Sequence, residues 1–222
     1  MSEIKDHERV NDILLGPLER PALQWLAAHM PAWMTPDILT GIGTFGAVLI
    51  AVSYWLTNYS EWFLWLASLG LVINWFGDSL DGTLARYRKI ERPKYGFFID
   101  HTVDALNETI IFLGFGLSSY LSFEIACLAL IGYLLMSVLV YVTTAVSGVF
   151  KISYGKLGPT EIRAIAILIN IFIFFVGNPS INLPTGRTTL VDLAVLIVAL
   201  ALFFIFIGSS FLQARQLAKE DV

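Results

Sequence analysis

Four aspartates between residues 78 and 104 are the side chains of this 222-residue chain best suited to chemistry. Asp78 and Asp81 are three positions apart, and Asp100 and Asp104 are four apart, so each pair would occupy one face of a helix. Both pairs lie in or beside apolar sequence, where acidic residues are costly and by default functional. The spacing predicts that the four carboxylates converge on one site.

Such a site needs cations, because four carboxylates repel one another in a medium of low dielectric. Oxygen ligands suit Mg²⁺ or Mn²⁺, and histidine and cysteine ligands at zinc-type spacing are lacking in the sequence. Two such ions could hold the attacking and leaving oxygens of a phosphoryl transfer. Gly82 and Ala85 leave room beside the acids, and Arg86 offers donors for a phosphate. The cluster therefore indicates a two-metal site for a pyrophosphate substrate.

The elements that position these acids are predicted to be membrane helices. With 56% hydrophobic and 14% charged residues and a mean hydropathy of +0.71, the chain is not an ordinary soluble domain. A spanning helix needs roughly 20 apolar residues. The apolar runs that meet this need lie at about 36–56, 62–87, 96–118, 124–150, 159–176 and 191–212. We predict an all-α integral membrane protein with six transmembrane helices in a membrane domain at 31–222.

The N-terminal segment, residues 1–30, is predicted to lie outside that domain. Within it, residues 8–30 mix leucines with charged side chains, which favours an amphipathic helix at the membrane interface. The alternative is a connecting linker, since Pro17 and Pro21 must bend or break a helix. No basic and apolar leader of the kind found in a cleavable signal peptide is visible.

Basic residues indicate the orientation. If both termini are cytoplasmic, 13 of the 14 Lys and Arg residues fall on the cytoplasmic side, and only Arg187 falls outside. A short basic turn at 87–95 would make the second and third spans antiparallel neighbours, with all four aspartates at one depth. We expect a multi-pass protein of the cytoplasmic (inner) membrane whose termini and acidic site face the cytoplasm.

The acidic stretch also carries a resemblance. It is similar to the signature of the CDP-alcohol phosphotransferases at all eight positions: Asp78, Asp81, Gly82, Ala85, Arg86, Gly96, Asp100 and Asp104. The resemblance implies a metal-dependent transfer of a substituted phosphate group from a CDP-linked donor to an acceptor hydroxyl, with release of CMP, in phospholipid biosynthesis. It also implies a homodimer among membrane lipids, with no nucleic acid as partner.

Roles for the single residues follow from the same resemblance. The first three aspartates would mainly hold two metal ions, and Asp104 would act as general base while close to metal. Gly82, Ala85 and Gly96 would line the cytidine pocket, and Arg86 would be a structural or phosphate-side residue. Residues 33–43 resemble the start of the family's first span, where Asp37 would either touch the nucleotide or cap the helix.

The donor and the acceptor are less constrained by the sequence. The short six-span form favours CDP-diacylglycerol as donor. His101 completes Asp-His-x-x-Asp, which resembles choline and ethanolamine phosphotransferases that use CDP-amino alcohols and diacylglycerol, although Thr102 replaces their usual glycine. His101 is therefore either a second acid or base in catalysis or a structural histidine.

The acceptor site is predicted near the start of the fifth span. Arg163 with Lys151 or Lys156 would suit a phosphate, and Glu161 would suit an ammonium group; the alternative is an ordinary helix-capping pattern. A divalent-cation transporter is the rival class of protein. It would need polar groups at successive depths, whereas the acids here lie at one side of the membrane.

Overall fold

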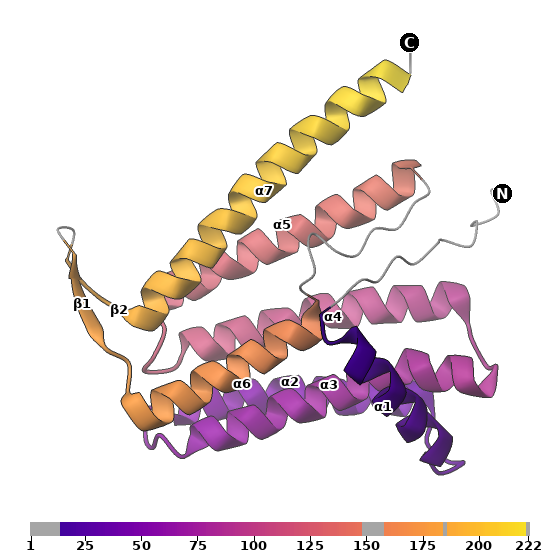
Figure 1. The fold of residues 1–222 in the computed structure, drawn as a ribbon, viewed down its shortest axis with the longest axis horizontal. Coiled ribbons are helices and arrows are strands. Elements are labelled where there is room, and N and C mark those ends of the chain that lie inside the picture. Colours follow the sequence, from indigo (N-terminus) through magenta and orange to yellow (C-terminus); the bar gives the residue numbers. More distant parts are fainter. Residues whose placement is uncertain (1–13, 148–157, 184–185, 221–222) are drawn as a thin grey trace.

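The computed structural model describes residues 14–147, 158–183 and 186–220. These residues form seven helices and one short hairpin (Figure 1). The helices are α1 (Gly16–His29), α2 (Pro36–Leu56), α3 (Phe63–Arg88), α4 (Pro93–Gly116), α5 (Phe123–Ser147), α6 (Pro159–Val176) and α7 (Leu190–Glu220), and the strands are β1 (Ser180–Leu183) and β2 (Gly186–Thr189).

The ends of the helices follow from local sequence. Thr35 caps α2, because its hydroxyl accepts the Ile38 N–H at 3.2 Å, and Pro36 occupies the first turn. Lys89 ends α3 in the left-handed conformation, with φ of 57°, and α4 begins at Pro93. The connection between α3 and α4 is therefore short, but the two acid-bearing helices do not pack along each other in the described part of the chain. Both pack on α2 instead, so the prediction that the second and third spans are direct neighbours is wrong.

Five of the described helices are long and apolar enough to cross a membrane: α2, α3, α5, α6 and α7. By helix length and composition this is a multi-pass membrane protein. The remaining predicted span, 96–118, corresponds to α4, which is 24 residues long but contains Asp100, Asp104 and Glu108 as well as Lys94. These charges set α4 apart from the other five, so the count of six spans stays a prediction.

Helix α2 packs along α3 and α4, and α6 packs on α3. Helix α5 packs against both α4 and α7 (Figure 1). Helices α2 and α3 approach closely, since a Cβ at Gly77 would lie 2.3 Å from the Gly43 nitrogen. A Cβ at Gly43 would lie 3.2 Å from the Asp78 nitrogen. The two glycines therefore bring the backbone of α2 directly against the turn that carries Asp78.

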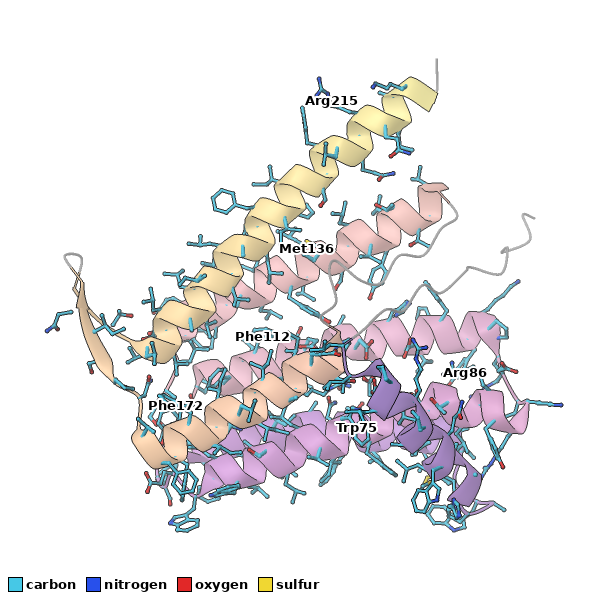
Figure 2. The ribbon with its side chains drawn as sticks, viewed as in Figure 1. Trp75, Arg86, Phe112, Met136, Phe172 and Arg215 are labelled. Carbon is cyan, nitrogen blue, oxygen red and sulfur yellow. The ribbon has the colours of Figure 1, made fainter. Side chains whose placement is uncertain are left out.

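The N-terminal segment contains the predicted helix, although α1 begins at Gly16 and residues 8–13 lie outside the described part of the chain. Pro17 falls in the first turn, where its missing N–H costs nothing, and Pro21 lies inside the helix. Helix α1 crosses α3 close to Trp75, which is labelled in Figure 2. Its buried face packs on α3, while Leu18 and Trp25 are 75% and 61% exposed, which fits an amphipathic helix.

The hairpin was not predicted. The sequence between α6 and α7 indicated turns only, whereas β1 and β2 pair antiparallel, with Ser180 opposite Thr189 and Leu183 opposite Gly186. The Asn178 side chain fixes this connection, because its Nδ2 donates to the Tyr120 carbonyl at 2.9 Å and its Oδ1 accepts the Val191 N–H at 3.2 Å. The hairpin lies at the opposite end of the helices from the α3–α4 connection (Figure 1).

Candidate active site

Asp78 is held by a residue from another helix. Nη2 of Arg163, on α6, donates to Asp78 Oδ2 at 2.7 Å, and Nε of the same guanidinium donates to Asn74 Oδ1 at 2.8 Å. Asn74 in turn donates to the Gly43 carbonyl on α2 at 2.9 Å. The Arg163 and Asp78 side chains are 12% and 19% exposed. The pair is therefore shielded from solvent, where a charge-assisted hydrogen bond is strong and the loss of one partner is costly.

Asp81 is held from α2. Thr40 Oγ1 donates to Asp81 Oδ2 at 2.7 Å, and the other carboxylate oxygen accepts the Gly82 N–H. Sequence reasoning assigned no role to Thr40. The available signal was its place in residues 33–43, where Pro36-Asp37-Ile38-Leu39-Thr40 resembles the start of the family's first span. Asp81 also interacts electrostatically with Asp78 and Asp100, so the two acidic pairs face each other.

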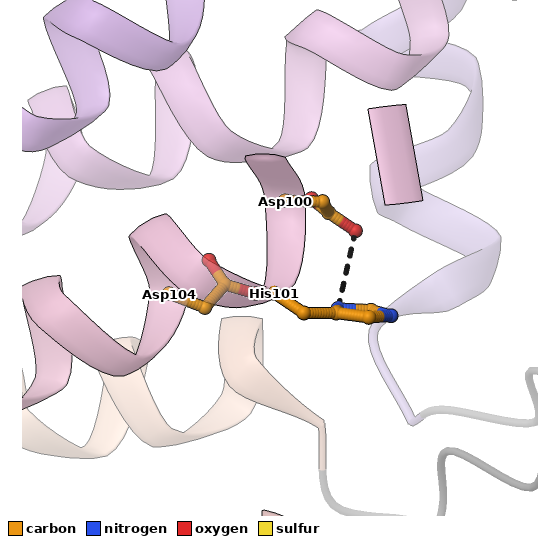
Figure 3. A group of neighbouring side chains, drawn as sticks. All are labelled: Asp100, His101 and Asp104. Atoms are coloured by element: carbon orange, nitrogen blue, oxygen red, sulfur yellow. Dashed lines mark ion pairs between the residues drawn. The ribbon is translucent and has the colours of Figure 1, made fainter. Parts of the chain in front are cut away.

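The second acidic pair belongs to a cluster suited to a metal ion. Asp100, His101 and Asp104 each offer a ligand atom, and these atoms lie within 4.8 Å of one another (Figure 3). His101 Nδ1 is 3.6 Å from Asp100 Oδ2. Asp104 interacts electrostatically with Asp78 on α3 and with Arg163. The structure thus brings all four aspartates to one place, as their spacing predicted, and adds a histidine and an arginine.

These residues fit a hard divalent cation. Carboxylate oxygens are the ligands that Mg²⁺ and Mn²⁺ prefer, and an imidazole is acceptable to Mn²⁺. The donor set on α4 lies within a few ångströms, and the α3 carboxylates are on the facing helix. Glu108, one turn beyond Asp104, interacts electrostatically with Arg163 and Asp78, so a further carboxyl group lies near the guanidinium.

A cavity of about 380 Å³ adjoins this cluster. Its lining consists of Phe97, Phe98, His101, Thr102, Ala105 and Tyr141. The His101 ring stacks on Tyr141 of α5, with ring centroids 5.1 Å apart, and meets the edge of Phe97 at 4.2 Å. His101 therefore lies between the carboxylates on one side and an apolar, aromatic space on the other.

The predicted nucleotide-binding residues other than Asp78 lie at one end of three helices: in the first turn of α2, the last two turns of α3 and the first turn of α4. Asp37 does not cap α2, since Thr35 does, and it forms an ion pair with Arg92 in the α3–α4 connection. A Cβ at Gly82 would lie 3.3 Å from Arg86 Nη1, so the space beside this glycine is taken by the arginine. A Cβ at Gly96 would meet open space. Ala85, between these residues, is partly exposed.

The predicted acceptor residues separate into different environments. Arg163 lies in the acidic cluster, as described above. Glu161 is 3% exposed, and its carboxylate accepts the Gly158 N–H at 2.9 Å and the Leu15 N–H at 2.7 Å. The capping alternative is thus confirmed for Glu161. Lys151 and Lys156 lie outside the described residues.

Together, the fold and the site define a multi-pass membrane protein with a carboxylate-rich centre on two consecutive helices that both pack on α2, and a shielded guanidinium beside it. The family model for CDP-alcohol phosphatidyltransferases matches residues 33–208. The chain therefore belongs to that enzyme family, and the resemblance seen in the acidic stretch is confirmed.

Curated relatives include two synthases of inositol-containing lipids. The phosphatidylinositol phosphate synthase of Cutibacterium acnes is 38% identical over 111 residues, which cover 47% of this chain and 51% of the relative. The archaetidylinositol phosphate synthase of Pyrococcus horikoshii is 34% identical over 104 residues, or 47% of this chain and 52% of the relative. The human cholinephosphotransferase 1 is 29% identical over 172 residues, 72% of this chain and 42% of the relative. The matches thus span about half or less of each relative's length.

Proposed function

We propose that this protein transfers a phosphatidyl group from CDP-diacylglycerol to the hydroxyl of a phosphorylated alcohol such as inositol phosphate, with release of CMP. The observation that carries the proposal is Arg163, a guanidinium that enters the carboxylate cluster from α6. Its Nη1 is buried and has no hydrogen-bond partner among the described residues. Because a planar guanidinium with spare donors suits phosphate, the arginine favours an acceptor that carries one.

The relatives support this choice of acceptor. The names of the Cutibacterium acnes and Pyrococcus horikoshii proteins give products in which an inositol phosphate is joined to a lipid. A phosphorylated acceptor is negatively charged and must approach a pyrophosphate donor that is also negative. A basic residue next to the metal-binding cluster would reduce the repulsion between them.

The reaction forms one bond and breaks one. The acceptor oxygen bonds to the phosphorus that carries diacylglycerol, the phosphoanhydride bond to the cytidine phosphate breaks, and CMP leaves with that bond's electron pair. Asp104 takes the proton of the attacking hydroxyl as general base. Mg²⁺ or Mn²⁺, two ions held by Asp78, Asp81, Asp100 and Asp104, would neutralise the pyrophosphate and acidify the hydroxyl.

The remaining residues bind the two substrates. Arg163 holds the acceptor phosphate, and Lys156 joins it there in our proposal. Gly82, Ala85, Arg86 and Gly96 border the cytidine, and Asp37 with its partner Arg92 lies at the same end of the helices. Glu161 contributes to the acceptor side only by holding the first turn of α6.

The membrane arrangement is part of the proposal. The acidic α4 would also cross the membrane and bring the number of spans to six, shielded from lipid by its contacts with α2 and α5. The basic α3–α4 connection and the site would face the cytoplasm, with the hairpin outside, because Lys and Arg favour that side. A homodimer is proposed on the family resemblance alone.

A second candidate is a phosphotransferase that uses CDP-choline or CDP-ethanolamine and diacylglycerol. It is favoured by His101, which lies beside Asp100 and lines the apolar cavity where a diacylglycerol hydroxyl could enter. In that reaction His101 would be the base. The similarity to cholinephosphotransferase 1 over 72% of this chain supports keeping this alternative.

One panel of assays separates the two. Purified protein with Mn²⁺ or Mg²⁺ receives CDP-diacylglycerol together with inositol phosphate, inositol, glycerol phosphate or serine, or receives CDP-choline with diacylglycerol. CMP release and the lipid product are measured by chromatography and mass spectrometry. We expect turnover with CDP-diacylglycerol and inositol phosphate. Turnover with CDP-choline alone would replace the first proposal by the second, and absence of CMP in every combination would exclude both.

A further inference from the structure

Two carboxylates join α1 to the first turn of α6. Glu161 of α6 accepts the backbone N–H of Leu15 at 2.7 Å, just before α1 begins. In the opposite direction, Glu19 of α1 accepts the hydroxyl of Thr160 at 2.7 Å. The start of α6 is therefore fastened to α1 by side chains from both helices.

Glu19 also binds α3. The oxygen that accepts the Thr160 hydroxyl accepts the Trp75 Nε1–H at 2.8 Å as well. Trp75 directly follows Asn74, the residue that receives the Arg163 Nε–H. One carboxylate oxygen thus links α6 to α3 within one turn of Arg163, which binds α3 directly.

A further hydrogen-bonded contact between α6 and α3 lies about two turns beyond Arg163. There Asn170 donates to Ser68 at 3.1 Å and accepts the Tyr54 hydroxyl at 2.9 Å. Without Glu19, the first turn of α6 would keep the bond from Leu15 to Glu161 and the bonds of Arg163 itself, but it would lose its link through Glu19 to Trp75, so this turn could shift relative to α3. A displacement of about 1 Å in a group that positions substrate can cost about 100-fold in rate.

We propose that Glu19 is a positioning residue for the transfer reaction. By binding Thr160 and Trp75 together, it fixes the helical turn from which Arg163 enters the site, and it thereby sets the affinity for the acceptor. This inference rests on the proposed function in taking Arg163 as the group that binds the acceptor phosphate.

Kinetics of two variants test the role. Glu19→Ala is expected to raise the KM for inositol phosphate about 10-fold, with the KM for CDP-diacylglycerol unchanged. Glu19→Gln keeps an amide oxygen that can accept both bonds and should behave like the parent protein. Glu124→Ala, which removes an exposed carboxylate from the first turn of α5, is the matched control. Equal changes in both KM values, or no rescue by glutamine, would overturn the proposal.

A double-mutant cycle with Arg163→Ala sharpens the result. If Glu19 acts through Arg163, Glu19→Ala should cause no further rise in acceptor KM once the arginine is gone. Independent, multiplying effects would show that Glu19 acts on stability or on another group, and the proposal would fall.

A chemical readout separates this inference from the proposed function. Arg163 is 12% exposed and should react slowly with phenylglyoxal, whereas the exposed Arg215 serves as an internal reference. Mass spectrometry should find faster labelling of Arg163 in Glu19→Ala and not in Glu19→Gln. Unchanged labelling would refute the positioning role even in an active enzyme. If Glu19→Ala speeds the labelling of Arg163 but the parent protein releases no CMP, the positioning role of Glu19 stands and the proposed function is refuted.

Discussion

The two acidic pairs differ in how the protein holds them. On α3, Asp78 is bound by Arg163 from α6, and Asp81 is bound by Thr40 from α2. On α4, Asp100 and Asp104 form a compact group with His101 that could hold a cation, next to an apolar cavity. The α3 pair is thus positioned by neighbouring helices, and the α4 pair is arranged for a ligand. A cation that uses all four carboxylates must share Asp78 with a guanidinium.

The largest effect is expected on the α4 pair. Asp104→Asn keeps the size of the side chain and removes the proposed base, so kcat for CMP release should fall by about 100-fold or more. Binding of CDP-diacylglycerol, measured by calorimetry in detergent, should change little. Full activity in this variant would remove Asp104 from the role of base.

A smaller loss is expected when Arg163 is replaced. Charge-assisted hydrogen bonds contribute about 1.5–3 kcal/mol, so Arg163→Ala should raise the acceptor KM about 10–100-fold. Because Asp78 is then released from its partner, Mn²⁺ should bind more tightly, which electron paramagnetic resonance can measure without any substrate. Arg215→Ala serves as control. Weaker Mn²⁺ binding would mean that the guanidinium supports the metal site and does not compete with it.

Thr40→Val tests the hydrogen bond that orients Asp81. Loss of such a supporting contact typically weakens metal binding by at least about 10-fold, and we expect an effect near that lower limit. The metal concentration at half-maximal activity and the direct Mn²⁺ titration should shift together. An unchanged Mn²⁺ affinity would indicate that Asp81 is oriented by the backbone N–H of Gly82 alone.

The smallest effect is expected for His101→Gln. If Asp104 is the base, this variant should lose only a few-fold in kcat, well below the roughly 100-fold cost of removing a general base. The assay is CMP release with each donor of the panel. A loss as large as that of Asp104→Asn would make His101 the base and would favour the amino-alcohol reaction.

The sequence predicted the parts of the site that depend on spacing. The four aspartates share faces because helical periodicity is regular, and the short basic turn makes α3 and α4 consecutive, so their convergence could be expected. The predicted apolar ranges agree with the helices to within a few residues over most of the described chain. The amphipathic helix predicted in the N-terminal segment is observed as α1.

The parts that depend on packing between distant segments could not be predicted. Arg163 was a candidate, yet nothing in the sequence places it on Asp78, 85 positions earlier. Glu161 could equally have faced a ligand. The sequence does not reveal that the backbone N–H of Leu15 donates to the Glu161 carboxylate, because the two residues are far apart in the chain. Gly77 drew no attention in the sequence, because its need for a missing side chain arises from the backbone of α2. The hairpin was missed since its strands are four residues each.

The central claim is that the acidic cluster of α3 and α4 catalyses transfer from a CDP-linked lipid. The most direct test is ³¹P nuclear magnetic resonance of CDP-diacylglycerol and inositol phosphate mixed with the purified, folded protein and Mg²⁺. We predict that the phosphoanhydride signals disappear while CMP and a new phosphodiester appear in equal amounts, and that Asp104→Asn shows neither change. Persistence of the phosphoanhydride with the parent protein, or equal turnover by the variant, would contradict the account.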